Sequence, residues 1–97
     1  MKSKLQKLIE EATVDCYGED EQFSGWACTL EDQIKCPQAC TASKNAAKLL
    51  KISETKGGRS INAMVEISGK RLLVPIEAID LKDKRQNNWI LAYKEWL

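Results

Sequence analysis

The segment DCYGEDEQFSGWACTLED, residues 15–32, is strongly acidic and core-forming at once. From residue 23 to residue 34 the apolar side chains recur at i, i+3, i+4, i+7 and i+11, the stripe of an amphipathic helix. We therefore predict a helix from about Asp20 to Gln33 that turns this stripe toward the core. The stripe consists of Phe23, Trp26, Ala27, Leu30 and Ile34.

The same segment carries six carboxylates and no Lys or Arg. These acids form either an ordinary solvated face or the wall of a cation site. Gly25 costs on the order of 1 kcal/mol in helix propensity, which indicates a close packing contact at that position. Gly18, just before the helix, predicts a left-handed or turn conformation. The six acids are Asp15, Glu19, Asp20, Glu21, Glu31 and Asp32.

Two further helices are predicted, one before the acidic segment and one after the strand region. Lys4–Ala12 has apolar residues at i, i+3, i+4 and i+7 and a polar opposite face. Asp83–Leu97 closes the chain with its aromatic side chains on one stripe, and Asp83 or Asn87 is its expected cap.

Between Gln38 and Leu81 the periodicity becomes that of short strands. Ile61–Ile67 alternates apolar and polar residues, and Ser68-Gly69 is a hairpin signal. Pro75 indicates an edge strand or a strand end. The remaining expectations are strands at Ala39–Ala42, Lys48–Glu54 and Arg71–Ile76, a strand or turn at Glu77–Leu81, and a turn-rich loop at Thr55–Ser60.

This order predicts an α+β fold with two N-terminal helices, a small antiparallel sheet of three to five strands, and a C-terminal helix. Closure of the short strands into an SH3-like barrel is the alternative. The 97 residues suffice for one domain, residues 1–97. No stretch approaches the roughly 20 apolar residues of a membrane-spanning helix, and the N-terminus lacks a signal peptide's apolar run. We expect a cytoplasmic protein with no membrane contact.

Calcium binding is one chemistry that the acidic segment can support, because Ca2+ prefers roughly six to eight oxygen ligands. The EF-hand spacing is absent, since Tyr17 and Trp26 stand where the third and twelfth loop positions would be. On one helix Asp20 and Glu31 lie on the order of 16 Å apart, so they cannot share an ion. Two loci follow, the helix start with Asp15, Glu19, Asp20 and Glu21, and the helix end with Glu31 and Asp32.

The two loci differ in what their charge indicates. Acids at a helix N-terminus are stabilised by the helix dipole without any metal, whereas acids at a C-terminus face its negative end. A nearby cation would relieve that repulsion at Glu31 and Asp32. From the residues alone, a solvated face is favoured over a calcium site.

Other site chemistries have less support. The cysteines, Cys16, Cys28, Cys36 and Cys40, lack the CxxC pairs of structural zinc sites, and reduced, buried or incidental thiols are expected. The chain contains no His, P-loop, GxGxxG or GxSxG. We therefore predict that the protein is not an enzyme.

The alternative function comes from an uneven charge distribution. Residues 1–41 carry a net charge of −4 and residues 42–97 carry +5. A small-barrel interaction module could bind an unknown protein or a nucleic acid through its basic strand face, with calcium binding lost. Nucleic acid is the weaker expectation because the strands lack aromatic residues for base stacking. The basic residues are Lys44, Lys48, Lys51, Lys56, Arg59, Lys70 and Arg71.

The run VDCYGEDEQFSGWACTLEDQIKCPQAC, residues 14–40, resembles the cyanobacterial calcium-binding protein (CcbP) family. Later, GKRLLVPIEAID at 69–80 looks like the family's G-R-x-L-x-V-P-L segment, and the closing NNWILAYKEWL is loosely similar to its last helix. The similarity spans most of the chain from residue 9 and is weakest over 44–60. The residues that carry it in the first half are Asp15, Tyr17, Glu19–Glu21, Gly25-Trp26, Leu30-Glu31-Asp32 and Pro37.

This resemblance implies a non-enzymatic calcium-binding protein, a Ca2+ buffer or sensor that uses surface carboxylates. It favours Asp32, in the Leu-Glu-Asp motif, as the first ligand. The remaining candidates are Glu31, Asp15, Glu19, Asp20 and Glu21.

Overall fold

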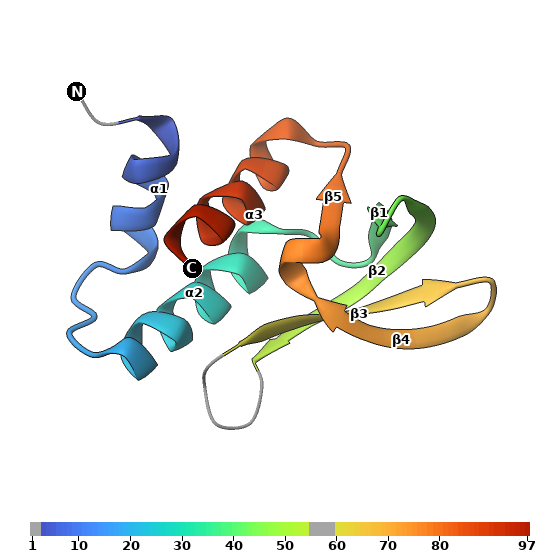
Figure 1. Cartoon of the computed structure of the whole chain (residues 1–97), viewed down its shortest axis with the longest axis horizontal. Coiled ribbons are helices and arrows are strands. Elements are labelled where there is room, and N and C mark those ends of the chain that lie inside the picture. The colour runs from blue at the N-terminus through green and yellow to red at the C-terminus, as the bar shows by residue number, and fades with distance from the viewer. Residues whose placement is uncertain (1–2, 55–59) are drawn as a thin grey trace.

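The computed structural model describes residues 3–54 and 60–97. Three helices and five strands follow one another in the predicted order (Figure 1). The loop expected at Thr55–Ser60 lies almost wholly outside the described residues. The elements are α1 (Lys4–Ala12), α2 (Glu19–Gln33), β1 (Gln38–Ala42), β2 (Asn45–Glu54), β3 (Ile61–Ile67), β4 (Lys70–Pro75), a 3-10 turn (Ile76–Ala78), β5 (Ile79–Leu81) and α3 (Lys84–Trp96).

The strands form one antiparallel sheet in the order β4-β3-β2-β1-β5. Its two end strands, β4 and β5, do not pair with each other, so the sheet is open and the SH3-like barrel alternative is wrong. Such closure would need β4 to reach β5. The 3-10 turn directly after Pro75 instead leads the chain across to pair β5 with β1 (Figure 1).

The core lies between the sheet and the helices. Alternate residues of β3, from Ile61 to Val65, are fully buried, as the period-2 pattern of that strand predicts. Trp26 of α2 is also fully buried, and its ring lies edge-on to Trp89 and Tyr93 of α3, with centroids 6.5 and 5.5 Å away. The predicted apolar stripe of α2 therefore faces the core as expected.

Gly25 allows α1 and α2 to approach each other closely. A Cβ atom added at Gly25 would lie 2.7 Å from the backbone oxygen of Ala12 and 3.0 Å from the sulfur of Cys16. Because a backbone oxygen cannot move aside as a flexible side chain can, no larger residue fits without a shift of one helix. The close contact predicted from the sequence at Gly25 is confirmed.

The β3–β4 hairpin turns through Ser68 and Gly69, which have φ values of 51° and 79°. Two positive φ values are the signature of a type I′ turn. β4 is an edge strand, so Pro75 lies where a missing N–H is tolerated.

The β1–β2 hairpin was harder to predict. Its turn residues Ser43 and Lys44 also have positive φ values, 49° and 70°, but neither is the Gly or Asn that usually marks such a turn. β2 consequently begins at Asn45, earlier than the predicted Lys48.

Side-chain caps fix the starts of the first and last helices. Ser3 and Gln6 form a reciprocal capping box at α1. Asp83 caps α3 by accepting from the backbone N–H of Gln86 at 3.1 Å, while Asn87 accepts from the N–H of Leu81 at 2.9 Å. Of the two predicted caps, Asp83 is therefore the one used.

The basic strand face is interrupted by an acid. Glu66 of β3 lies between Lys48 of β2 and Arg71 of β4 in the sheet register. This alternation of sign reduces the continuous positive field that nucleic-acid binding would need. In the described part of the chain, no helix is both long and apolar enough to cross a membrane.

Candidate metal site

The acidic segment divides between the two ends of α2, as the sequence predicted. All six candidate acids are exposed. Their local conformations and hydrogen-bond partners differ, however, and these differences distinguish acids that local structure explains from acids that it does not.

Asp15 lies in the loop between α1 and α2 with φ 59°, in the left-handed region. Asp and Asn adopt this conformation more readily than most other side chains. The left-handed residue of this loop is thus Asp15, and not Gly18, whose φ of −119° is extended. A backbone requirement accounts for an aspartate here without a metal.

The three acids Glu19, Asp20 and Glu21 form the first turn of α2. Gly18 precedes them and has no side chain to cap the helix, so the free N–H groups need another acceptor. Glu21 accepts instead from the N–H of Tyr17, the residue before the cap, at 3.0 Å, and so ties the preceding loop to the first turn. These acids therefore stabilise the helix start, whether or not they also contact an ion.

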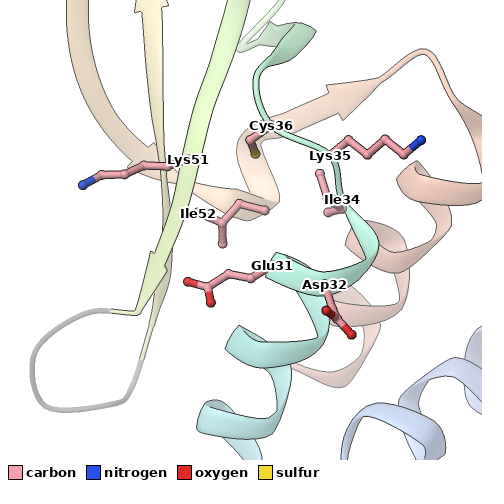
Figure 2. Close-up of a pocket in the computed structure, with 7 residues that line it drawn as sticks. All are labelled: Glu31, Asp32, Ile34, Lys35, Cys36, Lys51 and Ile52. Atoms are coloured by element: carbon pink, nitrogen blue, oxygen red, sulfur yellow. The ribbon is translucent and has the colours of Figure 1, made fainter.

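Glu31 and Asp32 occupy the last turn of α2, which contains no basic residue. Figure 2 shows their carboxylates pointing apart, that of Glu31 toward β2 and that of Asp32 toward the opposite side of the helix. Such divergence follows from the 100° step between neighbouring helix residues. The pair therefore presents two separate carboxylates at the end of the helix where negative charge is least favourable.

The opposed dipole effects at the two ends can be measured without calcium. In chelator at low ionic strength, Glu19→Gln should lower the free energy of unfolding by about 0.3–1 kcal/mol, and Glu31→Gln should raise it by a similar amount. The two substitutions remove the same charge from exposed positions on one helix. Thermal melting compares them directly, and equal shifts of the same sign would exclude the dipole as the cause.

A surface depression of about 550 Å³ lies between the end of α2 and β2. Figure 2 shows the ammonium groups of Lys35 and Lys51 pointing away from it, while the sulfur of Cys36 points inward. Burial, followed by the charge of Glu31, raises the pKa of the Cys36 thiol. The full lining consists of Glu31, Asp32, Ile34, Lys35, Cys36, Lys51 and Ile52.

A second depression of about 260 Å³ lies between the end of α2 and the start of α3. It brings Asp32 together with Asp83, whose pKa is lowered mainly by the hydrogen bond from the Gln86 backbone. The cations Lys35 and Arg85 also line it. The sequence predicted Asp83 only as a helix cap, and no sequence spacing indicates that Asp83 and Asp32 meet.

Gln86 fixes this junction of α2, β1 and α3. Its Oε1 accepts from the backbone N–H of Lys35 at 3.0 Å and from Nε2 of Gln38 at 2.6 Å, and its Nε2 donates to Asp83 Oδ2 at 3.3 Å. Asp83 is thereby held beside the end of α2. The backbone around Asp32 is positioned by a residue far away in the sequence.

No three acids, cysteines or histidines among residues 3–54 and 60–97 are grouped so as to hold a metal ion. All four cysteines are free thiols. The predicted ligand set thus remains a prediction. Glu31 and Asp32 line the first depression, and Asp32 lines the second together with Asp83.

A family model described as calcium binding matches residues 6–97 of this chain, which places it in a class of calcium-binding proteins. The chain belongs to the CcbP calcium-binding family. The matched residues include all six candidate acids and Asp83.

Solved structures show the same fold. The crystal structure of Anabaena CcbP matches with a TM-score of 0.82 at 16% identity, and the match covers 99% of this chain and 90% of that protein. A calcium-binding protein in its calcium-binding form matches with a TM-score of 0.82 at 17% identity, covering 98% of this chain and 90% of that one. A search of curated proteins gives no match.

Proposed function

We propose that this protein binds Ca2+ at the C-terminal end of α2, as a low-affinity buffer or sensor and not as an enzyme, with Asp32 as the principal ligand. Family membership supports the choice of ion. The observation that supports the choice of residue is that Asp32 lines both surface depressions, one with Glu31 and the other with Asp83.

The donors at this end of the helix suit a hard cation. Ca2+ is bound by carboxylates, by amide and backbone carbonyl oxygens, and by water. Asp32, Asp83 and Gln33 line the second depression and offer such oxygens. The last carbonyls of any α-helix also lack intrahelical partners.

The same surroundings limit the affinity. Only two carboxylates line the second depression, and Lys35 and Arg85, which also line it, would compete with a cation for their charge. Water would have to supply much of the coordination shell. Sites with few charged ligands bind Ca2+ with dissociation constants of about 10⁻⁴–10⁻³ M, and we expect this range here.

Millimolar Ca2+ should therefore raise the melting temperature of the chelator-treated protein. At a ligand concentration ten times the dissociation constant, binding adds about 1.4 kcal/mol to the free energy of unfolding, a shift of several degrees for a domain of this size. Asp32→Asn should abolish this gain. Calorimetry that compares added Ca2+ with NaCl at the same ionic strength distinguishes ion binding from general screening of the protein's charges.

Asp80→Asn is the matched control, because Asp80 is an exposed aspartate on β5 and lies outside both depressions. It should keep the full calcium response. Glu19→Gln distinguishes the two ends of α2, since it keeps the response only if the ion binds at the C-terminal end. The proposal would be contradicted if the melting temperature of the wild-type protein stayed unchanged up to about 10 mM added Ca2+, ten times the weakest dissociation constant expected.

A further inference from the structure

β4 is an edge strand with unusual apolar exposure. Leu72 is 45% exposed and Leu73 is 56% exposed, although they lie on opposite faces of the sheet. Leu72 pairs with the buried Val65 on the core side, and Leu73 pairs with Met64 on the outer side. Figure 1 shows β3 and β4 extending to the right, away from the three helices. The helices therefore leave Leu72 and Leu73 largely uncovered, whereas Val74, nearer the helices, packs against the core.

The hairpin geometry shows which backbone groups of β4 are unpaired. A two-residue type I′ loop is flanked by a hydrogen-bonded pair, here Ile67 and Lys70. Hydrogen-bonded and non-hydrogen-bonded pairs alternate along an antiparallel ladder. Arg71, Leu73 and Pro75 accordingly direct their backbone groups outward, which suits Pro75 because it has no N–H to satisfy.

We propose that β4 is a self-association edge, at which a second copy of this chain adds its own β4 antiparallel about a two-fold axis through Leu73. The two sheets then become one continuous sheet. This inference is independent of the proposed calcium site, which lies on the helical side of β2.

The strand is complementary to itself in this register. A two-fold axis perpendicular to the sheet keeps the same face of both copies on the same side, so residues pair only if their side chains share a face. Centring on Leu73 places it opposite the partner copy's Leu73 on the outer face, and Leu72 opposite Val74 on the core-side face. Farther from the axis, Arg71 of each copy lies opposite Pro75 of the other. About four hydrogen bonds form, two between the leucines and one from each Arg71 N–H to a Pro75 carbonyl.

Charge does not oppose this pairing. The two Arg71 side chains lie about four residues apart along the joined strands, on the order of 13 Å, which exceeds the Debye length of about 8 Å at physiological salt. The net charge of each chain is only +1. A net charge so close to zero leaves little electrostatic repulsion between two copies, and this favours their association.

An acidic peptide fits the same edge less well. Arg71 already lies opposite Glu66, which also lies opposite Lys48. Lys70 stands apart at the hairpin end of the strand, opposite Ile67. The centre of the edge, Leu72–Val74, is apolar and matches a second copy of itself better than it matches added carboxylates. An isologous contact of this kind also closes on itself and cannot extend into a fibre.

Sedimentation velocity over micromolar to millimolar protein, in chelator, tests the proposal. The wild-type chain should change from one to two copies of its 10.9 kDa mass as concentration rises. Leu73→Lys places two ammonium groups opposite each other and should raise the dissociation constant of the dimer by roughly tenfold or more.

Leu97→Lys is the matched control, because Leu97 is also 56% exposed but lies at the end of the chain. It should leave the dimer unchanged, and unaltered circular dichroism should show that both variants fold. A wild-type chain that stays monomeric at millimolar concentration, or a dimer equally sensitive to both substitutions, would overturn the proposal.

Discussion

Trp26→Ala should lower the free energy of unfolding by about 3–5 kcal/mol, the range for a large aromatic side chain removed from a core. Trp26 is fully buried, and it contacts Trp89, Tyr93 and Trp96 through edge-on or tilted rings. These contacts join α2 to α3, so the loss affects the packing of two elements. Urea unfolding followed by circular dichroism measures it.

Trp26→Phe separates ring packing from the polar atom. The Nε1–H of Trp26 is buried and finds no acceptor among the described residues, and an unsatisfied buried donor costs about 1–3 kcal/mol. Phenylalanine keeps one ring and removes that donor, so it should cost much less than alanine. Equal losses for the two variants would mean that ring packing is not what Trp26 contributes.

Gly25→Leu should be the most damaging substitution on the α1–α2 contact, with a loss of about 3 kcal/mol from overpacking. Even Gly25→Ala should destabilise, although helix propensity alone predicts a gain of about 1 kcal/mol. The cause is the backbone oxygen of Ala12, 2.7 Å from the added Cβ. The sign of the alanine effect therefore tests the contact itself.

Gly18→Ala provides the comparison within the same helix. Nothing lies within 4 Å of a Cβ added at Gly18, and its φ of −119° suits any residue. Only the modest cost of alanine at an N-cap is expected there, about 0.5 kcal/mol. If alanine at Gly25 and at Gly18 had the same effect in urea unfolding, the close approach of α1 and α2 would not be the reason for Gly25.

Most of the fold could be predicted because local signals agree with the packing. The stripe from Phe23 to Ile34 gave the inward face of α2, and the β3–β4 hairpin was evident from Ser68-Gly69. The β1–β2 turn was not, since Ser43 and Lys44 adopt positive φ without glycine. Whether a sheet closes depends on the direction in which the chain leaves β4, and no local period determines that.

The candidate site could be predicted only in part. Dipole reasoning separated Glu31 and Asp32 from the acids at the helix start, because that effect depends on position along one helix. The meeting of Asp32 with Asp83 depends on how α3 packs against the end of α2. Tertiary proximity of that kind leaves no trace in residue spacing, and a single sequence gives no other signal for it.

The amide of Gln86 also has a consequence for the order of folding. Its bond to the N–H of Lys35 joins residues 51 positions apart in the chain. A contact of such long range forms only after the intervening segment has closed. During synthesis α2 leaves the ribosome well before α3, so its acidic end cannot take its final form until the last helix has docked. A chain shortened by α3 would keep every one of the six candidate acids and still lack the junction that holds Asp32 in place.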